Sequence, residues 1–535
     1  MSNIPENENK EALGQNEENI AEEELSTIFS DPAVHKKTAE NVKKKPVWVV
    51  ILVAVLSVAI LIGGTVGIAK LIPEKDTEDP SLPTPEEDVT VLDMDSEDFK
   101  AVTITNSNGT FKLYAETIVT EALESNTSSE TKETRLWYLE GYDKELINEL
   151  AVGSKVTTLG GITATMEITK MSLADCGLEN PTHRVDFVTN DDKSFSVLVG
   201  KNNNDSMSGG VYLKLSDSDK IYIVSDTYKT NMEFTAFDFA NTDSLPHFQV
   251  GDDLASYKNS DGVITTFDTL TVSGANFGES IVIAPANSDN EELQSLIGYN
   301  IISPKKRIAE NVETLFEAFQ KGVLVDGVYS FDVSNASLKA VGLDNPDFVA
   351  TMKIGKQTLT YKFSLQEDGN YAAIADGEKL IKKVSASNVP FAAYTTTSFY
   401  SSWVCLNGID NLKGLTVVTP EKTYDFGIAA NPDTEAEDKY VITYEGVSID
   451  CQSFQDFYQV LISISCTDFT VDKLSGKAEY SFIFNFKDEI GGQNRIDFVK
   501  GEGSRYQYSS DGVALGKVNS SALNKIIKEL NKLVG

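Results

Sequence analysis

The chain has 535 residues, a formal net charge of −35 and a hydrophobic content of 41%. These values exclude a wholly disordered chain, and the length exceeds that of one ordinary domain. The charge argues against a nucleic-acid partner, because a polyanion would be repelled and no stripe of basic and aromatic residues is present.

The first predicted element is a disordered acidic cytoplasmic tail over residues 1–45. A transmembrane helix is predicted over residues 46–72, because PVWVVILVAVLSVAILIGGTVGIA at Pro46–Ala69 carries no charge and about 20 apolar residues span a bilayer. By the positive-inside rule, the lysines before this run leave the N-terminus in the cytoplasm and the C-terminal domain outside the cell. These lysines are Lys36, Lys37, Lys43, Lys44 and Lys45. We therefore expect a single-pass protein of the plasma membrane.

Two glycines in the predicted span, Gly63 and Gly67, form a GxxxG pattern that would let a partner helix approach closely. Small residues are also common in spans without such a partner, so both interpretations stay open. Residues 73–95 begin with PEKDTEDPSLPTPEED, which is rich in proline and acid. This composition predicts an extended stalk that holds the following part of the chain off the membrane.

An internal repeat lies beyond the stalk. SLADCGLENP at Ser172–Pro181 returns 165 residues later as SLKAVGLDNP at Ser337–Pro346. In each copy the serine predicts the N-cap of a short helix, and the glycine predicts its left-handed end. Because asparagine before proline favours extended backbone, a β-hairpin should follow. The predicted structural turn motif consists of Gly177, Leu178, Asn180 and Pro181, with Gly342, Leu343, Asn345 and Pro346 in the second copy.

Three similar strands precede these features: KAVTITN at Lys100, DTLTVSG at Asp268 and KGLTVVT at Lys413. Each leads to a helix with one apolar stripe. The stripes are Leu146, Ile147 and Leu150 in DKELINELA, Val312, Leu315, Phe316 and Phe319 in NVETLFEAFQ, and Phe454, Phe457, Tyr458 and Leu461 in SFQDFYQVL. The last unit lacks the glycine–leucine turn, keeps a hairpin with Gly-Gly at its bend, and ends in the apolar-striped helix SSALNKIIKELNKLVG.

The predicted fold class is α+β, with a single N-terminal transmembrane helix followed by tandem related modules of antiparallel sheet plus helices. The expected modules cover residues 96–250, 262–405 and, in divergent form, 411–535. A divergent last unit with a closing helix is typical of a cap in a repeat protein.

The sequence predicts no catalytic residue, cofactor or metal site. His35 lies in the tail, His247 in a predicted linker, and His183 where the second copy has Phe348, so no credible Ser/His/Asp or Cys/His set exists. A surface or packing role is expected for His183. The runs DMDSED at Asp93 and SDSDK at Ser216 resemble calcium loops only faintly, because they lack the glycine and terminal glutamate of that motif.

The four cysteines are Cys176, Cys405, Cys451 and Cys466. They are too few for a disulfide scaffold. Cys451 and Cys466 flank a predicted helix of roughly 18 Å, which is too long for a bond between them. Buried free thiols are expected.

The turns GLENP and GLDNP, each followed by paired strands, resemble the bacterial family called domain of unknown function 4340, as does VYLKLSDSDKIYIVSD at Val211–Asp226. The resemblance covers Phe99 to Tyr400 and is weak in the last module. It implies no activity and no catalytic residue. Members look like membrane-anchored partners of gliding-type ABC transporters, which implies an accessory subunit.

These observations favour a membrane-anchored, extracellular, non-enzymatic scaffold whose partners are ABC transporter subunits or a cell-wall component. The first alternative is an extracellular solute- or cell-wall-binding receptor that clamps a ligand between modules. The second is a carboxylate-dependent envelope hydrolase, which would need a deep cleft and one acid of raised pKa.

Overall fold

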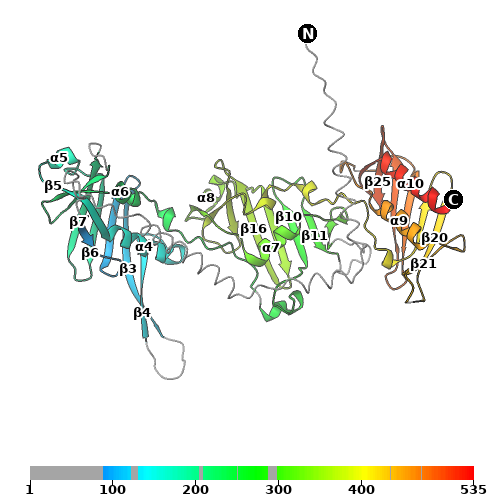
Figure 1. Ribbon diagram of the computed structural model, residues 1–535, viewed down its shortest axis with the longest axis horizontal. Helices are drawn as coiled ribbons and strands as arrows, with labels where there is room; N and C mark the ends of the chain where they lie inside the picture. The colour runs from blue at the N-terminus through cyan, green and yellow to red at the C-terminus, as the bar shows by residue number, and fades with distance from the viewer. Residues whose placement is uncertain are drawn as a thin grey trace, which may run out of the picture. The chain divides into compact units, whose positions relative to one another are not determined.

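The structure is a computed structural model that describes residues 88–121, 131–203, 209–249, 251–286, 298–433, 435–471 and 473–535. The predicted tail and transmembrane helix, with Gly63 and Gly67, lie outside these ranges. Among the described residues, no helix is both long and apolar enough to cross a membrane. These residues form antiparallel sheets with a few helices, so the α+β class is confirmed (Figure 1).

Sheet 1 contains nine strands in the order β1-β5-β9-β8-β7-β6-β2-β3-β4. Residues 89–93, which the sequence placed in the stalk, form its edge strand because they pair with β5. Its strands are β1 (Val89–Asp93), β2 (Phe99–Asn106), β3 (Gly109–Glu121), β4 (Thr131–Leu139), β5 (Gly161–Ile168), β6 (His183–Thr189), β7 (Ser194–Asn202), β8 (Val211–Leu215) and β9 (Ile221–Val224). Its helices are α4 (Glu149–Gly160), α5 (Leu173–Cys176) and α6 (Asp226–Met232).

The first helix differs from the prediction. A short 3-10 turn covers Lys144–Leu146, and α4 begins only at Glu149. The reason is Asn148, whose side chain accepts the Ala151 N–H at 3.0 Å and caps the helix there. The predicted stripe is therefore wrong for Leu150, which is 77% exposed. The residues that α4 buries are Val152, Val156, Leu159 and Gly160.

Sheet 2 also has nine strands, in the order β13-β12-β11-β10-β15-β16-β17-β18-β14. They are β10 (Thr269–Ser273), β11 (Ile281–Pro285), β12 (Tyr299–Ser303), β13 (Arg307–Ile308), β14 (Gly327–Ser330), β15 (Phe348–Ile354), β16 (Gln357–Leu365), β17 (Tyr371–Ala375) and β18 (Ile381–Val384). The helices are α7 (Glu313–Lys321) and α8 (Asn335–Ala340). The predicted stripe of α7 is confirmed: Leu315, Phe316 and Phe319 are buried, and the Phe319 ring stacks on Tyr361 with centroids 4.3 Å apart.

Sheet 3 has eight strands in the order β22-β21-β20-β19-β23-β24-β25-β26. They are β19 (Leu412–Val418), β20 (Thr423–Ala430), β21 (Tyr440–Tyr444), β22 (Val447–Ile449), β23 (Tyr480–Phe486), β24 (Gln493–Lys500), β25 (Arg505–Ser510) and β26 (Val513–Asn519). The predicted helices are α9 (Cys451–Ile462) and α10 (Ser520–Val534), which lie side by side (Figure 1). Gly491 and Gly492, with φ of 76° and 72°, turn the predicted hairpin.

One strand order recurs at the centre of all three sheets. The order β9-β8-β7-β6-β2-β3-β4 in sheet 1 corresponds to β18-β17-β16-β15-β10-β11-β12 and to β26-β25-β24-β23-β19-β20-β21. In each sheet a strand from early in the unit pairs with the first strand of a hairpin that comes later in the chain. These pairs are β2 with β6, β10 with β15, and β19 with β23. Fully buried pairs mark this register: Val102 with Phe187, Leu270 with Met352, and Leu415 with Phe484. A shift of one residue would turn these side chains out of the core.

A double hydrogen bond also recurs at the same place in each sheet. The first residue after β8, β17 or β25 bonds twice to a residue on the neighbouring strand. Its side-chain oxygen accepts the partner's N–H at 2.7–2.9 Å, and its own N–H donates to the partner's carbonyl oxygen at 2.8–3.2 Å. The pairs are Ser216 with Ser196, Asp376 with Thr360, and Asp511 with Arg495.

Candidate functional site

The predicted turn motif has the same central geometry in both copies. Gly177 and Gly342 are left-handed, with φ of 70° and 76°. Leu178 and Leu343 are each 2% exposed, and each donates its N–H, at 2.8 Å, to the carbonyl oxygen five residues earlier. This bond closes the helix end, so the turn residues serve to seat α5 and α8 against their sheets.

The two copies differ at the start of the helix. Ser172 caps α5 by accepting the Asp175 N–H at 3.1 Å, as predicted. The prediction for Ser337 is wrong, because Ser334 is the N-cap of α8 and accepts the Ser337 N–H. The cause is Asp332, whose carboxylate accepts both serine hydroxyls and draws the helix start toward itself.

The remaining motif residues lead into the hairpins. Asn180 and Asn345 are exposed, and Pro181 and Pro346 are half-buried. Strands β6 and β15 begin two residues after the prolines. The structure therefore brings the motif of each copy together as a turn, and its residues supply no reactive group.

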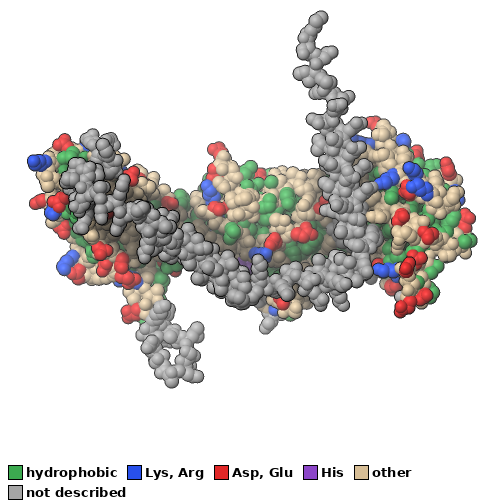
Figure 2. Space-filling view, in the orientation of Figure 1, with side chains coloured by type: hydrophobic (Ala, Val, Ile, Leu, Met, Phe, Trp, Pro, Cys, Tyr) green, Lys and Arg blue, Asp and Glu red, His purple; other side chains and the backbone are tan. Residues whose placement is uncertain are grey.

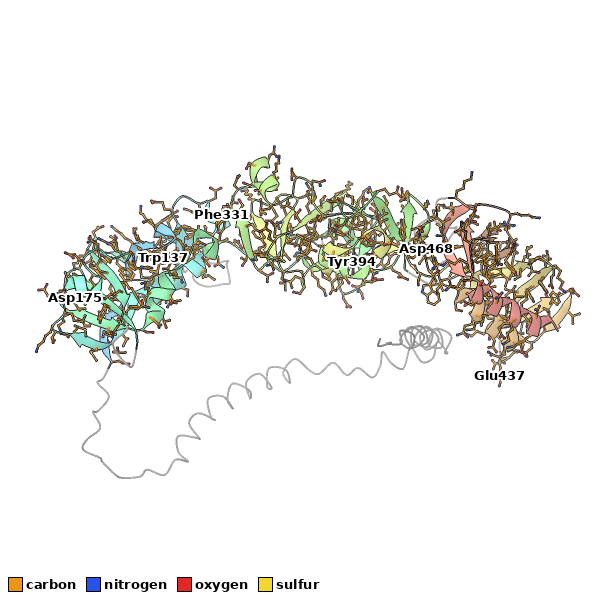
Figure 3. The ribbon with its side chains drawn as sticks, turned by 90° about the horizontal axis from the view of Figure 1, so that it is seen from above. Trp137, Asp175, Phe331, Tyr394, Glu437 and Asp468 are labelled. Carbon is orange, nitrogen blue, oxygen red and sulfur yellow. The ribbon has the colours of Figure 1, made fainter. Side chains whose placement is uncertain are left out.

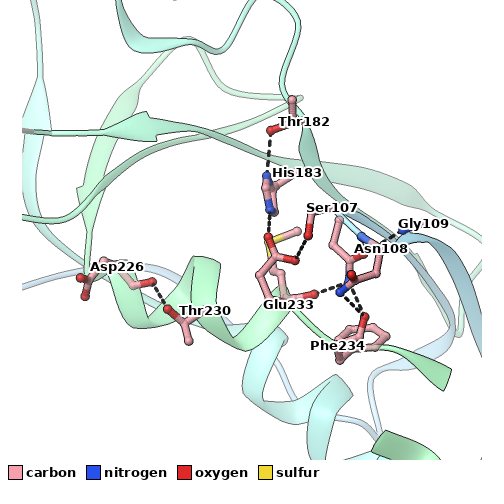
Figure 4. A network of polar contacts seen from close by, with 11 residues as sticks. Ser107, Asn108, Gly109, Thr182, His183, Asp226, Thr230, Glu233 and Phe234 are labelled. Atoms are coloured by element: carbon pink, nitrogen blue, oxygen red, sulfur yellow. Dashed lines mark hydrogen bonds and ion pairs between the residues drawn. The ribbon is translucent and has the colours of Figure 1, made fainter. Parts of the chain in front are cut away.

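His183 belongs to a polar network shown in Figure 4. Its Nδ1 lies 2.9 Å from the Thr182 hydroxyl, and its Nε2 contacts one carboxylate oxygen of Glu233. The Ser107 hydroxyl donates to the other oxygen of Glu233. The network joins the β2–β3 turn, the start of β6 and the end of α6. Burial alone would raise the pKa of Glu233, but the hydrogen bonds from Ser107 and His183 outweigh it and lower the pKa.

Thr182 contacts His183, and His183 contacts Glu233. This is the order of contacts found in a catalytic set of nucleophile, base and orienting acid. Here, however, both oxygens of Glu233 already serve His183 and Ser107, and His183 is only 5% exposed. We interpret the network as one that holds three elements together. Of the two roles expected for His183, surface or packing, its burial indicates packing.

A second buried group, Arg307, was not found from the sequence. It is 7% exposed and has no carboxylate partner among the described residues. Its guanidinium lies 3.8 Å from the centroid of the Tyr400 ring and donates from Nη2 to the carbonyl oxygen of Leu515 at 3.2 Å. Burial lowers the pKa of this guanidinium. Arg307 thus connects β13 with β26, and nothing in its local sequence KKRIAE marks it as buried.

A hollow with a charged lining lies on sheet 3 and has a volume of about 830 Å³. We call it the basic groove. Its charged and polar side chains are Lys500, Glu502, Arg505, Lys517, Thr470, Ser475 and Gln507. Asp468, labelled in Figure 3, pairs with Lys517 at 2.7 Å and with Arg505 at 3.5 Å. The hydrogen bond from Lys517 holds the pKa of Asp468 well below its usual range.

A smaller groove of about 280 Å³ contains the buried Lys382. Its ammonium donates to Glu378 and to the carbonyl oxygen of Asp243, both at 3.0 Å. These bonds, with a longer one of 3.5 Å to Ser244, occupy all three ammonium donors. Lys382 therefore has no donor left for a ligand.

The acidic runs form turns. The Asp98 carboxylate accepts the Asp95 N–H at 2.9 Å, and Ser216 makes the double hydrogen bond described above. Within the described ranges, no group of three or more His, Cys, Asp or Glu residues is arranged to hold a metal ion. All four cysteines are buried and free, as predicted.

Comparison with known proteins gave one match. The family model described as "Domain of unknown function (DUF4340)" matches residues 137–262. This stretch begins at Trp137 in β4 and includes the first turn motif, His183 and Glu233. No curated protein and no solved structure matches the chain.

Proposed function

The chain belongs to the family described as domain of unknown function 4340, and from that premise we propose that it is a membrane-anchored, extracellular, non-enzymatic interaction protein. The observation that carries the proposal is the strand order shared by three sheets, each with its own apolar core. Repeated units multiply contact surface, whereas catalysis needs one set of reactive groups around one pocket. We further propose that the three sheets are tandem copies of one module, the last being a divergent cap.

The proposed anchor is the uncharged run at Pro46–Ala69. Five lysines precede it between residues 36 and 45, which favours a cytoplasmic N-terminus and would put the three sheets outside the cell. The acid- and proline-rich residues that follow would separate the sheets from the membrane.

The proposed partners are subunits of a gliding-type ABC transporter. This part rests on the family resemblance of the turn motifs and on the net charge of −35, and Asp and Glu side chains are scattered over the face seen in Figure 2. A highly charged surface steers a partner of opposite charge and suppresses self-association.

Protease treatment of whole cells tests the topology. Tags at residue 1 and after Gly535 report the two ends. We expect the C-terminal tag to be digested while the N-terminal tag survives until the cells are lysed. A variant with the five lysines changed to glutamate should weaken this orientation, and a variant with five changes elsewhere in the tail is the matched control. Survival of the C-terminal tag in intact cells contradicts the proposal.

Affinity purification of the full chain from detergent-solubilised membranes tests the partner. Recovery of an ABC permease or ATPase above the level seen with an unrelated single-pass bait supports the accessory role. The control is a variant that ends before Val89, so that it keeps the anchor and lacks all three sheets. It measures capture by the anchor alone. Equal recovery by both baits contradicts a role of the sheets.

A further inference from the structure

A small cavity lies between β13 and the strands β25 and β26, and it has a volume of about 20 Å³. Lys306 and Arg307 line one side of it, and Tyr508, Ser510 and Leu515 line the other. One water molecule needs roughly 10–15 Å³, so the cavity has room for a single particle of about that size. Phosphate, sulfate and carboxylate ions contain several heavy atoms and are too large. Lys306 has an interaction of its own, which leaves Arg307 as the charge to be explained.

Arg307 is buried without a counter-charge. The residue is 7% exposed, and its Nη2 donates to the carbonyl oxygen of Leu515 at 3.2 Å. Its Nε has no hydrogen-bond partner among the described residues. Burial lowers the pKa of the guanidinium, and the groups that oppose this effect are Tyr508, Tyr400 and Cys466, none of which is a carboxylate. Because arginine keeps its proton in proteins, an unbalanced positive charge stays beside the cavity.

The acids nearest to the cavity do not neutralise this charge. No Asp or Glu is among the described residues that line it. Two carboxylates lie behind the lining, where Glu310 accepts the Ser401 hydroxyl at 2.6 Å and Asp511 accepts an Asn494 amide hydrogen at 2.9 Å. The chain's net charge of −35 acts mainly at the surface, since exposed charges are screened beyond about 10 Å at roughly 0.1 M salt. The lining therefore decides what the cavity attracts.

The lining also offers two hydrogen-bond donors. The Ser510 hydroxyl accepts an Asn494 amide hydrogen at 2.9 Å, and no described residue accepts the proton of that hydroxyl. Ser510 and Arg307 both line the cavity, so the Ser510 O–H and the Arg307 Nε–H can both donate there. A water molecule could accept both bonds but would leave the guanidinium charge unbalanced. A monatomic anion accepts both bonds and balances the charge as well.

We propose that this cavity binds one monatomic anion of the halide class, chloride being the halide of physiological fluids, and that the anion supports the contact between β13 and sheet 3. The inference goes beyond the proposed function and does not rest on it, because only described residues build the cavity. It adds an ion on which the stability of this contact depends.

Trp403 also lines the cavity and supplies the readout, because bromide quenches tryptophan fluorescence on contact. The probe is sodium bromide, titrated against sodium gluconate at constant ionic strength, with the full chain in nonionic detergent micelles. Trp48→Phe with Trp137→Phe leaves Trp403 as the one tryptophan. We expect quenching that saturates, as binding to a single site does, and that is reversed by added chloride, which competes for the cavity without quenching.

The site variant is Arg307→Met, which removes the charge and keeps a long side chain. The matched control is Arg505→Met, the same change at a half-exposed arginine of β25 outside the lining. We expect the bromide affinity to fall at least about tenfold in the site variant and to change less than about twofold in the control. Ser510→Ala keeps the charge and removes one donor, so it should weaken binding by a smaller factor. It also serves if a thermal melt shows that Arg307→Met does not fold.

Three results would overturn the proposal. Quenching of the native chain that rises linearly with bromide would show collisions without a site and would assign water to the cavity. Unchanged affinity in Arg307→Met, or in Ser510→Ala where Arg307→Met does not fold, would separate the binding from this cavity. Displacement of bromide by sulfate as effectively as by chloride would place the site on an open surface.

Discussion

The Asp511 carboxylate accepts the backbone N–H of Arg495 at 2.7 Å, while the Asp511 N–H donates to the carbonyl oxygen of Arg495 at 2.8 Å. Asp511 also has a φ of 47°, and Gly512 follows with 81°, so the two residues form the tight left-handed turn between β25 and β26. One side chain therefore fixes both the turn and the adjoining ladder.

Replacing Asp511 tests this double role. We expect Asp511→Ala to lower the free energy of unfolding by about 2 kcal/mol, because the Arg495 N–H loses its acceptor and alanine is strained at this φ. Asp511→Asn should cost less, since asparagine tolerates the left-handed region and keeps an acceptor oxygen. Urea unfolding and hydrogen exchange of the Arg495 amide measure the effect. Equal losses in the two variants would show that the hydrogen bond contributes nothing.

The two turn glycines should differ in their tolerance of a side chain. A Cβ at Gly177 would lie 3.0 Å from the Lys201 backbone nitrogen, whereas one at Gly342 would meet only the Ser364 side chain, at 3.4 Å. We expect Gly177→Ala to destabilise by roughly 2–3 kcal/mol and Gly342→Ala by about 1 kcal/mol. Gly369→Ala is the control, because its φ of 79° is similar and nothing lies within 4 Å. Thermal melts rank the three, and a larger loss at Gly342 than at Gly177 would refute the steric argument.

The Glu233 network should make stability depend on acid pH. The pKa of Glu233 is lowered in the folded protein, so its stabilising contribution is fully present above the ordinary value of about 4.5 and is lost as the pH falls through the folded pKa. We expect Glu233→Gln to melt below the wild type at pH 7 and the two melting temperatures to converge at acid pH. Ser107→Ala removes one of the two hydrogen bonds to Glu233. In that background, the difference in melting temperature at pH 7 between chains with and without Glu233→Gln should be smaller. A constant gap between pH 7 and pH 3 would contradict this linkage.

The cysteines should be unreactive until the chain unfolds. All four are buried, and burial raises the pKa of Cys405 to about 12, so almost none of its reactive thiolate exists at pH 8. We expect an aromatic disulfide reagent to react slowly with the native protein and rapidly with four thiols in urea. Fewer than four thiols in urea without reductant would reveal a disulfide and refute the assignment.

The sequence predicted strands well where apolar residues alternate, as in β2, β6 and β16, because period-two patterning is local information. It failed where a polar side chain decides. Asn148 moved the start of α4 to Glu149, beyond Leu146, and Asp332 moved the cap of α8 from Ser337 to Ser334. Both competitors are side-chain hydrogen-bond acceptors close to the start of the helix.

The candidate site was harder to predict. Lys500, Arg505 and Lys517 lie on successive strands, so only the register of β24, β25 and β26 brings them to one groove. The double hydrogen bonds had a weak signal, the Asp-Gly at Asp376 and Asp511, but Ser216 breaks that pattern. Arg307 had none, because a buried arginine without an acid partner has no local pattern that could reveal it.

The double hydrogen bond has an evolutionary consequence. It needs one side-chain oxygen and two main-chain groups, and serine or aspartate supplies that oxygen equally well at Ser216, Asp376 and Asp511. The strand order can therefore be the same where the residues differ: the family match covers residues 137–262, while the two further sheets keep the same order.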